Sequence, residues 1–434
     1  MLRTRISRHQ NKIGRRVMIE RRNILISALT GTALASVSTL ASAKKSAVIK
    51  KYLPARPAKD ADHTVVYRRE DEFCSWPYTM GFWETADGDF LQSFLSLTVV
   101  YDDPNNINHD NLAARATDRR MVTVRSKDRG RTWNGDNPII NMLDRGNDGG
   151  AVEKLEQIAP VNYLDKNVLI SNFGQNFGKP DARTYIQISK DSGETWSPKS
   201  FLPLDGLSSL TGLNSYLVRP DGRCLLFMFE SAEDGWNRRP LVYGSLDGGT
   251  EFRFMSFITP QHDPKAEASG DWKTSHAFGG HRWFYPRAIM LPNGRILCTL
   301  RCQRDPRGTM WTEVYKSDDG GRTWGFLSRL NDWGAPGSMV RMSDGRLVVV
   351  YGYRLPKFGI RAVVSEDEGA TWGSEIIVRD DGGSWDVGYP NAYEVEPGRI
   401  GAIYYFNSKD DPMQVVGGSK GGVRHIARSI FTVD

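Results

Sequence analysis

The 434-residue sequence contains few cysteines, and no long apolar run lies beyond its first 43 residues. The cysteine spacing matches no metal site, and no glycine-rich segment follows a phosphate-binding pattern, so we expect no metal and no other cofactor. No apolar run in the body reaches the roughly 20 residues of a membrane span, and we expect no stable membrane insertion. Four cysteines could pair in three ways, but we expect buried free thiols: Cys74, Cys224, Cys298 and Cys302.

Basic residues are in excess only near the N-terminus. Residues 1–43 hold eight Lys or Arg and a single acid, which leaves 49 basic and 50 acidic residues in the rest of the chain. The formal charge of +6 for the whole chain therefore does not indicate a basic binding surface, and we expect no nucleic-acid partner. The sequence leaves the oligomeric state open.

Residues 1–43 have the composition of an export signal. A weakly apolar stretch, Ile24–Ala41, leads into Ala41-Ser42-Ala43, which has the A-x-A form of a cleavage site. The preceding Arg21-Arg22 pair is similar to a twin-arginine signal, although an ordinary Sec leader with a chance arginine pair is the alternative. We expect an exported protein, periplasmic or extracellular.

The strongest signal in the remainder is an eight-residue repeat, Ser-x-Asp-x-Gly-x-Thr-Trp. Each copy follows a β-rich run and carries the residues of a tight turn: Asp bonds its own backbone, Gly accepts positive φ, and Trp packs over the turn. Each copy therefore predicts the connection between two strands of one sheet. Four copies are complete and a fifth is degenerate: 126–133, 189–196, 317–324, 365–372 and 245–252.

A second repeat, a turn followed by an apolar run, alternates with the first. Near-continuous apolar runs predict strands covered on both faces, as the inner strands of a propeller blade are. There are six such runs: 90–97, 168–173, 224–229, 296–300, 347–351 and 400–406.

Together the repeats predict an all-β, six-bladed β-propeller over residues 63–434, preceded by a lead-in at 44–62. Six inner runs and five turn motifs leave one blade without a motif. We expect the two ends of the chain to close that blade, with His63–Tyr67 joining Ile426–Val433.

These turn motifs resemble the Asp boxes of the sialidase (neuraminidase) superfamily, over roughly residues 63–434. The resemblance implies three arginines that hold a sugar carboxylate, a Tyr–Glu pair whose tyrosine is the nucleophile, and a loop Asp as acid/base. These groups would lie at the central axis, whereas Asp boxes lie on outer turns and indicate the fold rather than activity.

Two regions are similar to the family's central motifs. The run Leu291–Arg301 resembles the stretch that supplies the second arginine, here Arg301, and 386–390 resembles the nucleophile loop, with Tyr389 as candidate nucleophile. The glutamate that the family carries about 16 residues before this arginine is replaced by Tyr285. Glu230, at the end of an apolar run, is the candidate for the missing carboxylate.

The first arginine is also absent, because the segment that should carry it reads Ser75-Trp76-Pro77. The third is either Arg354 or Arg361, and the spacing does not decide. For the acid/base, the loop after the first apolar run offers Asp110 and His109. Further candidates are Arg287 for binding substrate and Trp76 for stacking on a sugar.

Three functions follow as alternatives, all with a glycan or oligosaccharide as partner. The first is a secreted glycosidase that releases a terminal acidic or unusual sugar by a Tyr/carboxylate mechanism. The second is a polysaccharide lyase on uronic acids that would use His109 or Tyr285 as base, with arginines to neutralise the carboxylate. The third is a propeller that binds glycans without catalysis.

Overall fold

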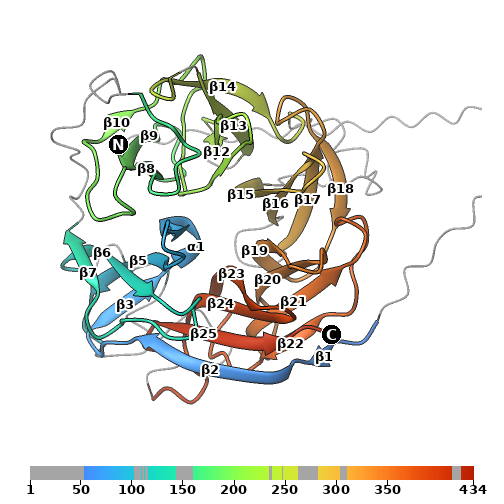
Figure 1. Cartoon of the computed structure of the whole chain (residues 1–434). Coiled ribbons are helices and arrows are strands. Elements are labelled where there is room, and N and C mark those ends of the chain that lie inside the picture. Colours follow the sequence, from blue (N-terminus) through green and yellow to red (C-terminus); the bar gives the residue numbers. More distant parts are fainter. Residues whose placement is uncertain are drawn as a thin grey trace, which may run out of the picture. The chain divides into compact units, whose positions relative to one another are not determined.

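Six antiparallel sheets follow one another around a central axis in the computed structural model (Figure 1). The prediction of an all-β, six-bladed propeller is confirmed, and the described residues contain one short helix, α1 (Pro77–Met80). The structure describes residues 53–101, 109, 112, 116–142, 160–233, 237–246, 248–261, 282–303, 310–412 and 422–434. The expected export signal lies outside these residues.

The first three blades are formed by consecutive stretches of the chain. Blade 1 contains β3 (Glu72–Ser75), β4 (Phe82–Glu84), β5 (Phe90–Thr98), β6 (Arg119–Ser126) and β7 (Ile139–Met142). Blade 2 contains β8 (Leu169–Gln175), β9 (Arg183–Ser189) and β10 (Ser200–Phe201), so its described part has three strands rather than the expected four. Blade 3 contains β11 (Tyr216–Val218), β12 (Cys224–Ser231), β13 (Arg238–Ser245) and β14 (Phe252–Phe257).

The other three blades complete the ring. Blade 4 contains β15 (Arg282–Met290), β16 (Ile296–Gln303), β17 (Met310–Ser317) and β18 (Gly325–Arg329). Blade 5 contains β19 (Gly334–Arg341), β20 (Leu347–Tyr353), β21 (Gly359–Ser365), β22 (Ile376–Arg379) and, parallel to β22, β1 (Arg56–Pro57). Blade 6 contains β23 (Gly388–Glu396), β24 (Arg399–Phe406), β25 (His425–Thr432) and β2 (Lys59–Tyr67).

The two ends of the described chain close blade 6, as the sequence predicts. Strand β2 pairs antiparallel with β25, with His63 opposite Ser429. It begins at Lys59, four residues earlier than the expected strand. This pairing lets one sheet hold both ends of the ring together.

The apolar runs form strands β5, β8, β12, β16, β20 and β24. In five blades this strand is second from the axis, and a further strand lies inside it (β3, β11, β15, β19 or β23). Every residue of β16 is buried, since neighbouring blades cover both faces of the sheet. All four cysteines are buried and free, which confirms that prediction.

Each complete Asp box connects two neighbouring strands of one sheet, as predicted: β6 and β7, β9 and β10, β17 and β18, or β21 and β22. In the box of blade 1, Asp128 accepts hydrogen bonds from the Thr132 amide at 2.8 Å and the Thr132 hydroxyl at 2.6 Å, and Trp133 donates to the Gly130 carbonyl at 3.2 Å. Trp133 also packs edge-on against Tyr393 of blade 6. The motif therefore closes its own turn and also contacts the preceding blade.

Proline residues shape the inner strands where they meet the axis. Trp76, Tyr285 and Tyr389 each precede a proline and each adopt a left-handed conformation, with φ of 53°, 61° and 50°. The proline ring disfavours right-handed helical geometry in the residue before it. In β15 and β23 the strand register is interrupted at this point, so the bulge directs the aromatic side chain out of the ladder.

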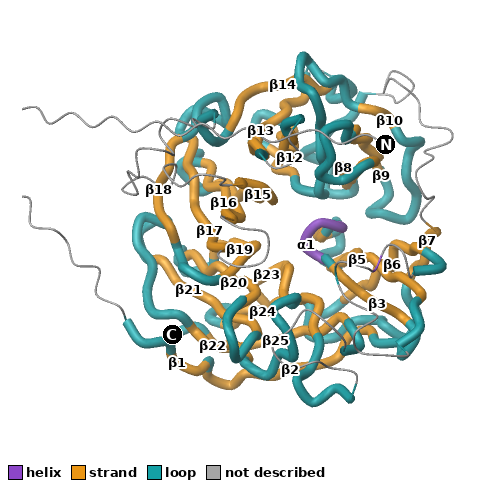
Figure 2. Tube along the Cα trace, turned by 180° about the vertical axis from the view of Figure 1, so that it is seen from behind, coloured by secondary structure: helices purple, strands orange, loops and turns teal. Residues whose placement is uncertain are grey.

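Helix α1 follows the first of these prolines and lies inside the ring of strands, as both views show (Figure 2). No helix in the described part of the chain has the length and apolar character needed to cross a membrane.

Candidate active site

Two tyrosines and an arginine from blades 4 and 6 meet at the axis. The Tyr389 hydroxyl accepts a hydrogen bond from Arg301 Nη1 at 2.7 Å and donates to the Tyr285 hydroxyl at 3.3 Å. All three side chains are nearly buried, with exposed fractions of 5 to 8%. Burial and the neighbouring Tyr389 raise the pKa of Tyr285 above its usual range, so Tyr285 stays protonated at neutral pH.

Three guanidinium groups surround this tyrosine pair. Those of Arg238 and Arg301 lie 5.0 and 4.7 Å from the centre of the Phe284 ring. Those of Arg301 and Arg354 lie 5.9 and 5.7 Å from the centre of the Tyr389 ring. Shared aromatic neighbours thus place three positive charges from blades 3, 4 and 5 in one cluster, called here the arginine cluster.

The arginine cluster has no acidic partner among the described residues. Arg301 bonds to Tyr389 and Gln303, Arg238 to the Gly178 carbonyl, and Arg354 to the carbonyls of Ala335 and Trp385. The Nε atoms of Arg238 and Arg301 are buried without a hydrogen-bond acceptor. Buried charges are ordinarily paired, so this arrangement suits a bound anion.

A histidine–aspartate pair borders the cluster. His109 Nδ1 lies 3.4 Å from Asp386 Oδ1, and the His109 ring contacts Trp76 edge-on at 5.4 Å and Trp385 at 6.1 Å. Trp385 in turn lies 5.6 Å from the guanidinium of Arg354. Asp110, the other acid/base candidate, lies outside the described residues.

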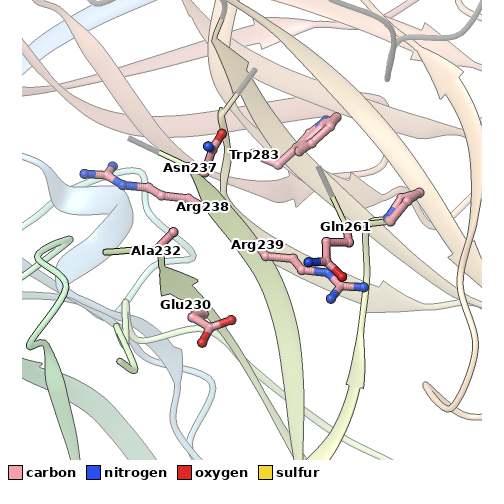
Figure 3. Close-up of a pocket in the computed structure, with 8 residues that line it drawn as sticks. Glu230, Ala232, Asn237, Arg238, Arg239, Gln261 and Trp283 are labelled. Atoms are coloured by element: carbon pink, nitrogen blue, oxygen red, sulfur yellow. The ribbon is translucent and has the colours of Figure 1, made fainter. Parts of the chain in front are cut away.

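A pocket of about 310 Å³ lies beside the cluster between blades 3 and 4 (Figure 3). Arg238 and Arg239 leave β13 in opposite directions, and Arg239 faces Gln261 (Figure 3). The Arg238 guanidinium lies 5.0 Å from the centre of the Phe284 ring. The lining residues are Glu230, Ala232, Asn237, Arg238, Arg239, Pro260, Gln261 and Trp283.

Glu230 belongs to this pocket and is not the partner of Tyr389. Its carboxylate accepts hydrogen bonds from the amide and hydroxyl of Ser208, both at 3.0 Å. The expected pair of Tyr389 with Glu230 is therefore not formed, because Glu230, at the end of β12, bonds to Ser208. Tyr285 occupies the place beside Tyr389 instead.

Two further arginine candidates lie elsewhere. Arg361, on β21, forms an ion pair with Glu375 and stacks on Tyr353 at 3.3 Å, which corrects its assignment to the substrate-binding group. Arg287 is partly buried, and it bonds to Asn391 and to the Tyr78 carbonyl, so it joins β15, β23 and α1. Desolvation lowers the pKa of Arg287.

Sequence reasoning missed Arg238 and the contact between Asp386 and His109. Arg238 begins β13 directly opposite Ser231, in a segment with no family-like motif. Asp386 lay inside the recognised nucleophile loop, and its closeness to His109 depends on blades 1 and 6 being adjacent. A usable signal was the repeated aromatic–Pro pair, at Trp76, Tyr285 and Tyr389, which marks the axial end of three inner strands.

The fold and the axial cluster define a six-bladed propeller of the Asp-box type with a polar centre. The chain belongs to the BNR repeat-like domain family, whose model matches residues 142–402. A comparison with curated protein sequences finds no match.

Three solved structures illustrate the similarity in fold. A protein of unknown function from Dyadobacter fermentans is 20% identical with a TM-score of 0.61, covering 86% of this chain and 98% of that one. The Trypanosoma rangeli sialidase is 13% identical with a TM-score of 0.52, covering 86% of this chain and 60% of that one. The Penicillium chrysogenum α-L-arabinanase complexed with arabinobiose is 13% identical with a TM-score of 0.51, covering 85% and 97%. At these identities the similarity shows the fold alone.

Proposed function

We propose that this protein is a glycosidase that releases a terminal acidic sugar from a glycan, with Tyr389 as nucleophile. The observation that carries the proposal is the arginine cluster, three adjacent guanidinium groups with no carboxylate partner among the residues that the structure describes. A planar guanidinium pairs with a carboxylate through two parallel hydrogen bonds, and a sugar carboxylate would supply the missing negative charge.

Arg301 supports Tyr389 as the attacking group. Its hydrogen bond to the Tyr389 oxygen stabilises negative charge that develops on that oxygen. As Tyr389 attacks the anomeric carbon, its proton passes to Tyr285, which releases its own proton to water through the 8% of its surface that is exposed. A tyrosine nucleophile suits an acidic sugar, since a neutral phenol approaches a carboxylate-bearing substrate with less repulsion than a carboxylate does.

The pocket beside Arg238 fits the part of the glycan next to the acidic sugar. It opens next to the cluster and offers both polar groups and the ring of Trp283. Sugars bind to such mixed surfaces through hydrogen bonds and stacking.

We also propose that the activity is exported, on the strength of residues 1–43. A fusion of these residues to a reporter protein would test this. Recovery of the reporter outside the cytoplasm is expected, and its loss when Arg21 and Arg22 are both replaced by Lys would assign the twin-arginine route. Cytoplasmic retention of the unaltered fusion would contradict the proposal.

The decisive experiment is a panel of 4-nitrophenyl glycosides of N-acetylneuraminic, glucuronic and galacturonic acid, with neutral glycosides as controls. We expect release of 4-nitrophenol from at least one acidic glycoside and none with Tyr389→Phe. A fluorinated analogue of the active substrate should leave a covalent adduct on Tyr389, detected by peptide mass spectrometry. Full activity of Tyr389→Phe would overturn the assignment.

The second candidate is β-elimination from a uronic acid, favoured by the lack of a carboxylate bonded to Tyr389 among the described residues. There the same arginines would neutralise the substrate carboxylate, and a tyrosine or His109 would remove the adjacent proton. An unsaturated product that absorbs in the ultraviolet, formed from a uronate polymer, would identify the lyase. Tight binding of acidic sugars without any turnover would instead identify a glycan-binding propeller.

A further inference from the structure

The pocket between blades 3 and 4 contains a second arginine whose charge is not neutralised. Arg239 is half-buried, its Nε donates to the Thr259 carbonyl at 3.0 Å, and its guanidinium lies 3.6 Å from the centre of the Phe257 ring. In the described part of the chain no carboxylate pairs with Arg239, and Nη1 and Nη2 have no hydrogen-bond acceptor. One hydrogen bond and one ring contact therefore hold the guanidinium and leave its two terminal nitrogens available to a ligand.

The residue opposite Arg239 on the neighbouring strand does not supply the missing charge. Glu230 of β12 is the direct cross-strand partner of Arg239, a position at which opposite charges usually stabilise a sheet. Glu230 accepts its hydrogen bonds from the amide and the hydroxyl of Ser208 instead, both at 3.0 Å. Arg239 extends toward Gln261 (Figure 3). The two charged groups thus line one pocket without forming an ion pair.

Other arginines that stack on an aromatic ring show what Arg239 lacks. Arg329 lies 4.4 Å from the centre of the Trp311 ring, and its Nε donates to the Asn331 carbonyl at 3.0 Å, as Arg239 does to a carbonyl. Arg329 Nη2 in addition pairs with Asp332 at 2.9 Å. The same combination of ring and carboxylate occurs at two more arginines: Arg361 with Tyr353 and Glu375, and Arg379 with Phe406 and Asp381.

The charge and size of the pocket favour an anion on a sugar. Its charged lining residues are Arg238, Arg239 and Glu230, so the net charge is positive. Burial lowers the pKa of Arg239, and a bound anion would offset the free energy that desolvation of this charge costs. The volume of about 310 Å³ lies at the lower end of the usual range for small-ligand sites, which suits one sugar residue.

The pocket also adjoins the arginine cluster. Arg238 lines the pocket, and its guanidinium lies beside the Phe284 ring together with that of Arg301. Arg238 Nε is buried without a hydrogen-bond acceptor. A ligand whose acidic terminal sugar lies at the cluster therefore places its next sugar in the pocket.

We propose that this pocket binds an anionic substituent, a carboxylate or a sulfate, on the sugar next to the terminal acidic sugar. The inference rests on the glycosidase function proposed above and names its substrate class, a glycan with negative charges on two successive sugars. Arg239 determines this specificity, because Nη1 and Nη2 together present the planar fork that pairs with two oxygens of a carboxylate or sulfate.

Pairs of disaccharides that differ in one charge on the second sugar test the proposal. The carboxylate pairs are digalacturonic acid and the dimer of N-acetylneuraminic acid, each compared with the methyl ester of its second residue. The sulfate pair is glucuronyl-N-acetylgalactosamine with and without a 6-sulfate. Calorimetry in Tyr389→Phe measures binding without cleavage. We expect the second charge to tighten binding by about tenfold in at least one pair, and this gain should shrink as ionic strength rises.

Three variants separate this pocket from the arginine cluster. Arg239→Met should remove the tenfold gain and change the affinity for acidic monosaccharides by less than about twofold, whereas Arg238→Met should weaken the monosaccharides too. Arg329→Met is the matched control and should keep the gain, since it removes a stacked arginine that is already paired. Glu230→Gln should bind the doubly charged disaccharides at least as tightly as the parent protein, because it removes a negative charge from the pocket.

Three outcomes would overturn the inference. The first is equal or undetectable binding of the two members of every pair. The second is a gain that persists in Arg239→Met. The third is weaker binding of the doubly charged disaccharides in Glu230→Gln, which would show that Glu230 accepts hydrogen bonds from sugar hydroxyls there. Failure of the glycosidase proposal is distinguishable, because it appears as a lack of turnover of every acidic glycoside while a gain that depends on Arg239 still supports the pocket.

Discussion

Replacing Arg238 with Met tests whether the arginine cluster is a carboxylate site. Arg238 is partly buried, and its guanidinium lies against Phe229 and Phe284, with no acidic partner in the described part of the chain. Methionine keeps most of the length and apolar contact of the arginine stem while it removes the charge and the donors. The variant therefore isolates the contribution of the guanidinium group.

The expected loss of affinity follows from the strength of a charged hydrogen bond. Such a bond contributes about 1.5–3 kcal/mol, which corresponds to a KM or Kd increase of about 10- to 100-fold. The loss should be confined to acidic ligands. The methyl ester of the same sugar carries no negative charge, and its already weak binding should change by less than about threefold.

The same substitution should stabilise the protein without ligand. The guanidinium groups of Arg238 and Arg301 lie 5.0 and 4.7 Å from one ring centre, so they are less than 10 Å apart. At an effective dielectric constant of about 20, two like charges at ~10 Å repel by about 1.7 kcal/mol. Because Arg238 is partly exposed, we expect a gain of about 1 kcal/mol, or on the order of 2 °C in Tm.

The assay combines isothermal calorimetry with the acid and its methyl ester, and thermal unfolding without ligand. Arg361→Met is the matched control, since Arg361 is paired with Glu375 outside the cluster and its loss should lower stability without changing affinity. Equal weakening of acid and ester in Arg238→Met would refute the carboxylate site. A fall in the Tm of Arg238→Met would refute the claim that the positive charges of Arg238 and Arg301 repel each other without a neutralising partner.

Four further predictions follow from the same contacts. Tyr389→Phe should bind the acidic sugar within about threefold of wild type but release no product, and measurable turnover would contradict its role as nucleophile. Glu230→Gln should change kcat by less than about threefold because its carboxylate bonds to Ser208 and not to Tyr389, and a loss near that of Tyr389→Phe would reinstate it as the partner carboxylate. Arg287→Met should cost about 2–3 kcal/mol in denaturant unfolding while the folded enzyme keeps its KM, because Arg287 joins three inner elements. Burial would raise the pKa of Asp319, but hydrogen bonds from Thr323 outweigh burial and lower this pKa to about 2. The ionised carboxylate of this Asp box therefore stabilises the fold above about pH 4, and this stabilisation is lost as the pH falls toward 2. Asp319→Asn should flatten the fall in Tm over that range, and an unchanged slope would exclude the effect.

The sequence by itself was sufficient for the fold. Asp boxes carry all their bonding partners within eight residues, as the contacts of Asp128 with Thr132 show, so their structure is local. An apolar run such as Leu347–Tyr351 indicates a strand whose two faces are both buried, whatever its place in the chain. Even the closure of blade 6 followed from counting repeats, because a strand left without a partner must pair somewhere.

The composition of the axial site was accessible only in part. Arg301 and Tyr389 were found because short stretches around them resemble family motifs, whereas Arg354 was one of two candidates that the spacing left open. The structure brings these three together. Glu230 was assigned because it lies at the end of an apolar run. That position predicts the end of a strand, but it does not predict in which direction the carboxylate points. Arg361 failed for a related reason, since the ion pair with Glu375 holds it within the outer strands of its blade.

Tertiary structure alone decided which residues share the centre. Arg238 meets Arg301 because blades 3 and 4 are adjacent in the ring, and Asp386 meets His109 because blade 6 closes against blade 1. Those contacts join residues 63 and 277 positions apart, so no local pattern encodes them. Bulges at residues before proline then direct Tyr285 and Tyr389 out of their strands toward the axis. The repeats in the sequence determined that the fold is a ring of six blades. Which blades are neighbours in that ring determined which side chains meet at its centre.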